Sequence, residues 1–301
     1  MRVIVSGSSG LIGSALGAQL ASTGDEMIRL VRRQPHSAGE IQWDPHAADG
    51  GIDHAALAGA DAVVHLAGAP IAAGRWTTAR KREIRDSRVA GTTALVSVLT
   101  AMSNPPSVLL SGSAIGYYGD TGGREVDESS PAGAGFLAEV VRDWEAAAAP
   151  AGNAGIRVVN LRTGIVLSRN GGVLGRLLPV FRLGLGARIG PGTQVMSWIM
   201  LTDLVRILAF LLESRDIKGP VNLTAPHPAT NAEFTAALAT AVGRKARLGI
   251  PAVALQLGLG EAAGELLSSA RVMPRRLLQA GGEALWHSGG PIAAALAAEL
   301  S

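Results

Sequence analysis

Three glycines near the start of the chain are spaced so that a phosphate group could come close to the backbone. They occur as Gly7-x-x-Gly10-x-x-Gly13, directly after the β-branched run Val3–Val5 and directly before a helical stretch, residues 14–20. N–H groups at a helix N-terminus attract a pyrophosphate, and a Cβ at the turn would block its approach. The pattern predicts a dinucleotide site, and a tight turn that binds nothing is the alternative it leaves open. The residues expected to contact the dinucleotide are Gly7, Ser9, Gly10, Leu11, Ile12 and Gly13.

Two arginines stand at the point where a dinucleotide fold selects between NAD and NADP. Met27–Val31 predicts the second strand, and Arg32 and Arg33 follow it directly. A fold that prefers NAD usually carries an acid there to bind the ribose hydroxyls. Guanidinium groups instead suit a 2′-phosphate, which they bind through charge-assisted, forked hydrogen bonds. The pair therefore predicts NADP(H) as the cofactor, and an ordinary solvated arginine pair is the alternative.

Hydroxyl side chains at the end of a later strand could handle a substrate oxygen and its proton. Val108–Ser113 predicts a buried strand that runs into Tyr117 and Tyr118, which are the two tyrosines of the chain. A serine at the end of a parallel strand, followed by tyrosines, can hydrogen-bond a substrate carbonyl beside a nicotinamide. Ser113, Tyr117 and Tyr118 are therefore the predicted catalytic residues. The alternative is that they only satisfy backbone groups at a strand-to-loop junction.

The ends of the remaining strands should meet at the same edge of the sheet. Asp61–Leu66 predicts a buried strand that ends in small residues, and Ile156–Leu161 predicts another. Ligands bind outside the carboxyl ends of parallel strands. His65 lies inside an apolar run and is expected to be a core residue, whereas Arg75 could reach a phosphate or remain solvated. The further predicted cofactor contacts are Leu66, Ala67, Gly68, Arg75, Ser111, Gly112, Arg162, Gly164 and Ile165.

Composition excludes several classes of protein. The chain has 301 residues, of which 48% are apolar and 17% charged, so a sizeable core is expected. The net charge of only +3 implies no nucleic acid partner. Because cysteine is absent, there are no disulfides, no thiolate metal sites and no cysteine nucleophile. No metal site of another kind is predicted. No apolar run reaches the roughly 18 residues of a spanning helix, and the chain opens directly on a strand. We therefore expect no membrane partner and a cytoplasmic location.

Alternating strands and helices predict an α/β fold with a Rossmann-type, doubly wound parallel sheet. The expected NADP(H)-binding domain comprises residues 1–168, with late strands and a helix from about 194–224 contributing to it. From residue 251 the pattern changes to short helices. Residues 169–193 and 225–301 are therefore assigned to a smaller, mainly helical lobe on the substrate side.

Several motifs together resemble those of the extended short-chain dehydrogenase/reductases. Beside the glycine turn, the resemblance rests on Ala67-Gly-Ala-Pro-Ile71, Ser111-Gly-Ser-Ala-Ile-Gly-Tyr-Tyr-Gly119, Trp144-Glu145 and Leu161-Arg-Thr-Gly-Ile-Val-Leu167. More narrowly, the chain is similar to the atypical branch of epimerase family proteins, related to nucleoside-diphosphate-sugar epimerases. The terminal lobe, with Arg271-Val-Met-Pro274, resembles the uncharacterised carboxyl-terminal domain of that branch. The resemblance implies a Rossmann-type NADP(H) domain with a smaller lobe over a substrate site.

The chain departs from the superfamily at the residues that carry its usual chemistry. The superfamily uses Tyr-x-x-x-Lys, but the matching helix reads Phe136-Leu-Ala-Glu-Val140, and the motif occurs nowhere in the chain. The resemblance aligns Ser113 with the superfamily's catalytic serine and Tyr117 with a tyrosine near the substrate. Two functions remain open: an epimerase or oxidoreductase acting on a sugar-nucleotide-like or other carbonyl or hydroxyl substrate, and an NADPH-binding structural or sensor module with little turnover. The expected partner is a small-molecule substrate, for a monomer or homodimer.

Overall fold

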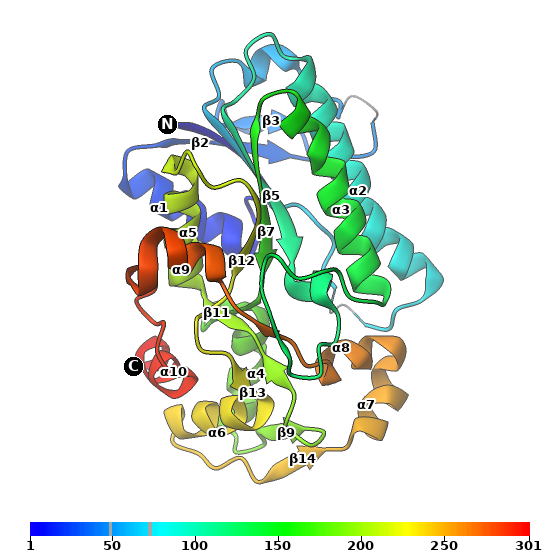
Figure 1. Ribbon diagram of the computed structural model, residues 1–301, viewed down its shortest axis with the longest axis vertical. Helices are drawn as coiled ribbons and strands as arrows, with labels where there is room; N and C mark the ends of the chain where they lie inside the picture. The colour runs from blue at the N-terminus through cyan, green and yellow to red at the C-terminus, as the bar shows by residue number, and fades with distance from the viewer. Residues whose placement is uncertain (48–49, 72–73) are drawn as a thin grey trace.

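Seven of the described strands form one parallel sheet at the centre of the protein (Figure 1). The computed structural model describes residues 1–47, 50–71 and 74–301. In spatial order the strands are β3 (Glu40–Gln42), β2 (Glu26–Val31), β1 (Arg2–Ser6), β4 (Ala62–His65), β5 (Val108–Ala114), β7 (Arg157–Thr163) and β12 (Gly219–Leu223). The chain starts in the middle of the sheet and winds outward in both directions. This order confirms the Rossmann-type, doubly wound sheet.

The central strands are apolar on both faces because helices cover both sides. Val3, Ile4 and Val5 are fully buried, so β1 is a continuous apolar run rather than an alternating one. Ser6 pairs with His65 of β4, and His65 pairs with Ser111 of β5. This register brings the carboxyl ends of β1, β4 and β5 to one edge of the sheet.

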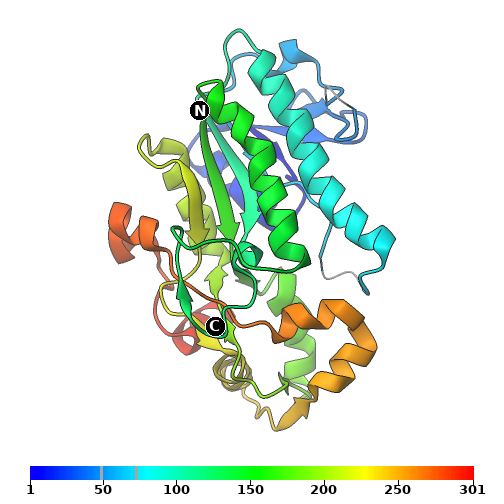
Figure 2. The same ribbon diagram turned by 45° about the vertical axis from the view of Figure 1, so that its right-hand side comes forward.

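Two pairs of helices cover the sheet (Figures 1 and 2). Side chains of α5 (Leu201–Glu213) share one core with α1 (Leu11–Ser22) and the sheet, and this core includes Leu16 and Leu208. On the opposite face α2 (Thr78–Ala101) packs beside α3 (Phe136–Asn153). The sheet is thus buried between two helical layers, which leaves the strand ends available for a ligand.

A second lobe has its own apolar core, which includes Leu174, Phe181, Trp198 and Leu296. Its helices are α4 (Gly172–Arg182), α6 (Asn231–Ala241), α7 (Ala252–Leu259), α8 (Ala263–Leu267) and α10 (Ile292–Leu300). Short strands pair within it: β8 (Ile165–Ser168) with β11 (Trp198–Met200), β9 (Ala187–Ile189) with β14 (Leu248–Ile250), and β10 (Val195–Met196) with β13 (Ala229–Thr230). The mainly helical second lobe therefore accompanies the sheet, as expected.

One late stretch returns to the sheet. β15 (Arg271–Val272) pairs with β6 (Glu125–Val126), and α9 (Arg275–Gly281) packs on β12 beside α5 (Figure 1). Leu277 and Trp286 belong to the same core as β1. The sequence analysis assigned this stretch to the smaller lobe, but its apolar side chains cover a face of the sheet near the edge strand β12.

Short 3-10 helices complete the connections between these elements. They are η1 (His54–Leu57), η2 (Ile115–Tyr118), η3 (Gly260–Ala262) and η4 (Gly282–Leu285). Among all helices of the described ranges, none combines the length and the apolar character needed to cross a membrane.

Candidate cofactor and substrate site

The turn after β1 depends on close contact between backbone segments. Gly7 has a φ of +68°, and a Cβ on it would lie 2.8 Å from the carbonyl carbon of Leu66. A Cβ on Gly13 would lie 2.4 Å from the Gly7 carbonyl oxygen. Helix α1 begins at Leu11 with Gly10 as its N-cap, and no described side chain caps it. The helix N-terminus therefore presents N–H groups that could donate hydrogen bonds to a phosphate.

A pocket of about 890 Å³ opens at this edge of the sheet, which is the size of a nucleotide-binding site. Its walls are the glycine turn, the end of β2, the loop after β3, the loop after β4 and the start of α2. The predicted cofactor residues in its lining are Gly7, Ser9, Arg32, Arg33, Ala67 and Gly68. The predicted residues outside its lining are Gly10, Leu11, Ile12, Gly13, Leu66, Arg75, Ser111, Gly112, Arg162, Gly164 and Ile165.

The adjacent arginines at the end of β2 have different surroundings. Arg33 donates two hydrogen bonds to Glu40, of 2.7 and 2.8 Å, and Arg29 approaches the same carboxylate at 3.1 Å. The hydrogen bond from Arg33 lowers the pKa of Glu40 to about 2, and the charge of Arg29 acts in the same direction. Arg32 forms no hydrogen bond or ion pair with any described residue, and it lines the pocket. The end of β2 therefore presents one unpaired guanidinium, Arg32, beside one that is fixed in orientation, and on the other side of the pocket Arg82 of α2 also bonds to no described residue.

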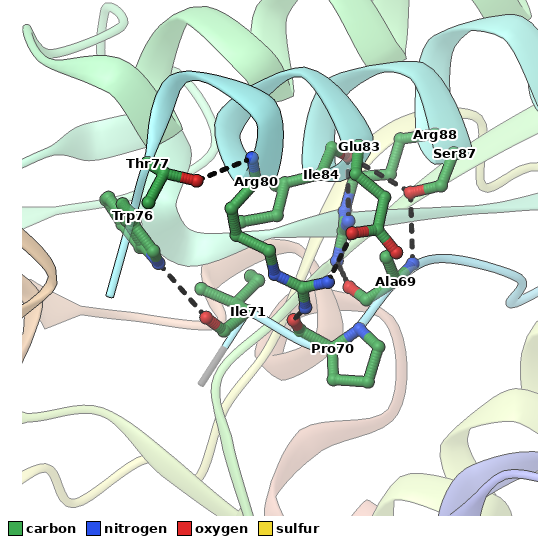
Figure 3. Close-up of polar contacts among 10 residues, drawn as sticks. All are labelled: Ala69, Pro70, Ile71, Trp76, Thr77, Arg80, Glu83, Ile84, Ser87 and Arg88. Atoms are coloured by element: carbon green, nitrogen blue, oxygen red, sulfur yellow. Dashed lines mark hydrogen bonds and ion pairs between the residues drawn. The ribbon is translucent and has the colours of Figure 1, made fainter. Parts of the chain in front are cut away.

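The opposite wall is the loop after β4, which side chains of α2 hold in place (Figure 3). Ser87 Oγ accepts the Ala69 N–H at 3.0 Å, and the Arg88 guanidinium donates to the Ala69 carbonyl at 3.1 Å. Arg88 also donates to the Ile84 carbonyl of its own helix at 2.9 Å. Arg88 is buried without a carboxylate partner in the described part of the chain, and burial lowers its pKa to about 10. These bonds fix the backbone that forms the pocket wall.

Arg75 lies apart from the pocket and contacts the second lobe. Its Nε donates to the Gly258 carbonyl at 3.1 Å, and its Nη2 donates to the Leu257 carbonyl. Nearby, Lys81 forms an ion pair of 2.7 Å with Glu261. In this structure the Arg75 guanidinium is engaged at the junction between the start of α2 and the end of α7, and its predicted phosphate contact stays a prediction.

A polar cluster connects β5, α3 and β7 beneath η2. Ser113 Oγ donates to Glu145 Oε1 at 2.7 Å. Arg162 donates to both Glu145 oxygens, at 2.8 and 2.9 Å, and only 3% of its side chain is exposed. Burial disfavours the charged guanidinium, but the bonds and charges of Glu145 and Tyr118 outweigh it and raise the pKa of Arg162. The cluster therefore contains a buried, charge-compensated pair next to the predicted catalytic serine.

The tyrosines have unequal access to a substrate. The Tyr118 hydroxyl donates to Asn222 Oδ1 at 2.7 Å and accepts from Arg162 at 2.9 Å, and burial raises its pKa to about 12. A phenol held in this way gives up its proton poorly, so the geometry favours Tyr117 over Tyr118 as the proton donor, and the catalytic role of both stays a prediction. Tyr117 is half-buried, its ring centroid lies 3.4 Å from the Arg162 guanidinium carbon, and its hydroxyl bonds to no described residue.

His65 is a core residue, as predicted. It is fully buried, its Nδ1 lies 2.6 Å from Ser6 Oγ, and its ring meets Trp43 edge-on at 5.8 Å. Burial lowers its pKa to about 4, so the ring is neutral near pH 7. It serves the packing between neighbouring strands rather than catalysis.

Comparison with known protein families assigns the chain to one of them. Residues 3–224, which are most of the chain, match the family described as the NAD dependent epimerase/dehydratase family. The chain belongs to this family. Residues 250–281 additionally match a domain of unknown function, DUF1731. These two matches confirm the family that the motifs predicted, and they also confirm the resemblance of the terminal lobe to that branch's carboxyl-terminal domain.

Relatives from distant organisms share nearly the whole length of this epimerase/dehydratase-family chain. The epimerase family protein Mb2239 of Mycobacterium bovis is 48% identical, with 93% of this chain and 92% of the relative covered. The human epimerase family protein SDR39U1 is 40% identical, with 93% and 94% covered.

Solved structures agree with the fold over the full chain. The crystal structure of human SDR39U1 (isoform 2) with NADPH matches with a TM-score of 0.91 and 37% identity, covering 100% of this chain and 99% of that one. A nucleoside-diphosphate sugar epimerase from Corynebacterium glutamicum matches with a TM-score of 0.80 and 37% identity, covering 100% of this chain and 58% of that one.

Sequence reasoning missed three polar residues of this epimerase/dehydratase-family site. Glu40 and Asn222 received no role, and Glu145 entered only as part of a motif. A signal for Glu145 does exist: it follows the buried Trp144 on the apolar side of α3, where an acid needs a partner. The partner itself could not be found from the sequence, because Arg162 lies on a different element.

Proposed function

We propose that the chain binds NADP(H) with its adenosine half in the pocket, and that it is an epimerase or oxidoreductase: NADP⁺ would take hydride from a substrate hydroxyl carbon, and NADPH would give hydride to a substrate carbonyl carbon. The observation that carries the cofactor preference is Arg32, an unpaired guanidinium in the pocket wall at the end of β2. A 2′-phosphate would meet Arg32 directly and Arg33 in the orientation that Glu40 imposes. The pyrophosphate would accept from the N–H groups of the glycine turn. Human SDR39U1, crystallised with NADPH, supports this assignment.

The preference can be tested with fragments of the cofactor. Calorimetric titration with 2′,5′-ADP and with 5′-AMP isolates the contribution of the 2′-phosphate. We expect 2′,5′-ADP to bind more tightly by tenfold or more, since one charge-assisted bond contributes about 1.5–3 kcal/mol. Arg32→Ala should remove most of the difference, whereas Arg142→Ala, an exposed arginine on α3, should leave it unchanged. Equal binding of the two fragments to the unaltered protein would contradict the proposal.

The substrate side of the proposal rests on Ser113 and Glu145. When bound, the nicotinamide supplies the position to or from which hydride passes. Ser113 Oγ donates to Glu145, so its lone pairs can accept a bond from a substrate hydroxyl. Glu145 Oε1 can then take the serine proton as the serine takes that of the substrate. Tyr117, whose hydroxyl is free, is the candidate to bond the same oxygen. The substrate class is sugar-nucleotide-like or another hydroxyl or carbonyl compound.

A second candidate function is an NADPH-binding structural or sensor module with little turnover. The observation that favours it is the engaged state of Tyr118, combined with the absence of Tyr-x-x-x-Lys. No described tyrosine has a lysine beside it to lower the cost of releasing its proton. In this case the cluster around Arg162 would serve stability alone.

The two functions differ in whether hydride passes between the cofactor and a substrate. We would follow absorbance at 340 nm, with NADPH for aldehydes and ketones and with NADP⁺ for sugar nucleotides, and would analyse the sugar nucleotides for epimerised product, for the unaltered protein and for Ser113→Ala and Tyr117→Phe. An enzyme changes the absorbance or forms an epimer with some member of the panel, and both variants slow this while NADPH still binds. A module binds NADPH and gives neither change with any member. The monomer-or-homodimer state and the cytoplasmic location stay predictions.

A further inference from the structure

Exposed apolar side chains gather at the end of the second lobe. The described part of the chain exposes ten large apolar side chains, and six of them lie around β9, β14 and α7. Leu183, Val253 and Leu257 are exposed by 75%, 64% and 73%. Proteins that stay free in water rarely leave such a group uncovered. The six residues are Leu183, Leu185, Leu248, Ile250, Val253 and Leu257.

Local geometry brings these side chains together. Leu248 and Ile250 are two residues apart on β14, so they project from the same side of the strand. Val253 and Leu257 are four residues apart on α7, so they share a face of the helix. Leu248 pairs with Ala187 of β9, and α7 follows β14 after one proline. In Figure 1, β9 and β14 lie at the end of the molecule opposite β3, with α7 next to them.

Cations without acidic partners adjoin this group along the chain, directly before Leu183 and directly before β14. Arg182, Arg244, Lys245 and Arg247 are exposed, and none forms an ion pair with a described residue. Arg244 Nε donates to the Arg182 carbonyl at 2.9 Å, which holds the two basic segments side by side. The surface therefore combines aliphatic side chains with uncompensated positive charge.

Helix α7 is apolar apart from Gln256, and the protein covers it only in part, where it packs against α8. None of its residues is buried, and no charged residue occurs from Leu248 to Gly260. A helix that is apolar all round normally lies inside a protein core or in lipid. A protein partner would cover one face of such a helix, whereas lipid can surround every part that the protein leaves free.

We propose that these six apolar residues and four cations form a surface that adsorbs the protein to an anionic lipid bilayer. The cations meet the headgroups, and the side chains of α7 and β14 enter the boundary below them. Adsorption requires no spanning helix. A second copy placed here by a two-fold axis would instead bring the cations against their own counterparts, which disfavours self-association. The proposal does not depend on NADPH binding.

Vesicle sedimentation tests this surface with the full chain. The probes are vesicles of phosphatidylcholine alone and of phosphatidylcholine with phosphatidylglycerol in equal parts. We expect binding to the anionic vesicles only, weakened by salt. Arg244→Gln/Lys245→Gln/Arg247→Gln should lower the partition coefficient about a hundredfold, since each cation contributes roughly fivefold. Val253→Ser/Leu257→Ser should also lower it, although the charge is unchanged.

A control variant removes the same charge elsewhere. Arg142→Gln/Arg215→Gln/Lys218→Gln alters three exposed cations outside this surface and should bind vesicles as the unaltered protein does. Val253→Ser/Leu257→Ser and the control variant should keep the melting temperature, because their altered side chains are exposed, whereas Arg244→Gln also loses the bond to the Arg182 carbonyl. Failure to bind anionic vesicles overturns the proposal, as does equal loss in the control variant. A dimer that Val253→Ser/Leu257→Ser separates, without vesicle binding, would overturn it in favour of a self-interface.

Discussion

Arg33 and Glu40 face each other across the end of β2 and β3 through two hydrogen bonds, of 2.7 and 2.8 Å. Because Arg29 approaches the same carboxylate at 3.1 Å, one acid orients two of the three arginines in this wall of the pocket. Arg29, Arg32, Arg33 and Glu40 together leave a net charge of two positive units. A 2′-phosphate carries roughly −1.5 to −2 near pH 7, so the wall matches its charge.

Glu40 should contribute to stability in a defined pH range. Its pKa falls to about 2 in the folded protein from an ordinary value of 4.5, chiefly through the bond from Arg33. The folded state thus favours the ionised form, so its stabilising effect is complete above about pH 4.5 and is lost as the pH falls toward 2. We expect Glu40→Gln to have a shallower loss of stability over this range in urea unfolding. Identical pH profiles for the two proteins would contradict the pairing.

Two glycines of α1 should respond differently to alanine. At Gly13 a Cβ would lie 2.4 Å from the backbone oxygen of Gly7, which cannot move without opening the turn. We expect Gly13→Ala to cost about 1–3 kcal/mol and to weaken nucleotide binding. At Gly17 the Cβ meets only the flexible end of Met27, so the helix-propensity gain of about 1 kcal/mol should offset the contact. Urea unfolding compares them, and equal losses would argue against a specialised turn.

The buried pair of Arg162 and Glu145 should be costly to break. Arg162→Ala leaves an uncompensated carboxylate in the cluster, and we expect a loss of about 3–5 kcal/mol. Arg85 forms an ion pair of 2.7 Å with Asp143, but both side chains are well exposed. Arg85→Ala, the matched control, should cost at most about 1 kcal/mol. The measurement is chemical unfolding at pH 7, and similar losses for the two variants would show that the cluster is not buried as described.

Substitutions of the two neighbouring tyrosines should differ in their effect on stability. Tyr118→Phe removes the partner of Asn222 and Arg162, so we expect a loss of about 1–3 kcal/mol in unfolding experiments. Tyr117→Phe keeps the ring against Arg162 and breaks no hydrogen bond to a described residue, so its stability should change by less than about 0.5 kcal/mol. The reverse order of losses would contradict the assigned roles.

Local patterns predict the elements of this fold well. The apolar run Val3–Val5 and the glycines after it suffice to place β1 and the turn, because both depend on neighbouring residues. Thr230 and Glu233 form a capping box at the start of α6, a pattern that depends only on residues three apart. The parallel sheet follows from the alternation of strands and helices.

Contacts between elements that are distant in the sequence could not be predicted from the sequence. Glu145 and Arg162 are 17 residues apart, on a helix and a strand, and no local pattern pairs them. Arg75 contacts Gly258 across 183 residues, a contact that no local pattern indicates. The packing of α9 on the sheet could not be predicted either, because the pattern of a short helix does not indicate which element it packs against.

The most direct test of the account is a fluorescence titration with NADPH and with NADH, for the unaltered protein, Arg32→Ala and Arg142→Ala. We predict that NADPH binds at least tenfold more tightly than NADH, that Arg32→Ala removes most of this preference by weakening NADPH alone, and that Arg142→Ala changes neither affinity. If NADPH and NADH bind equally, or if neither binds below millimolar concentration, the assignment of this pocket to NADPH is wrong.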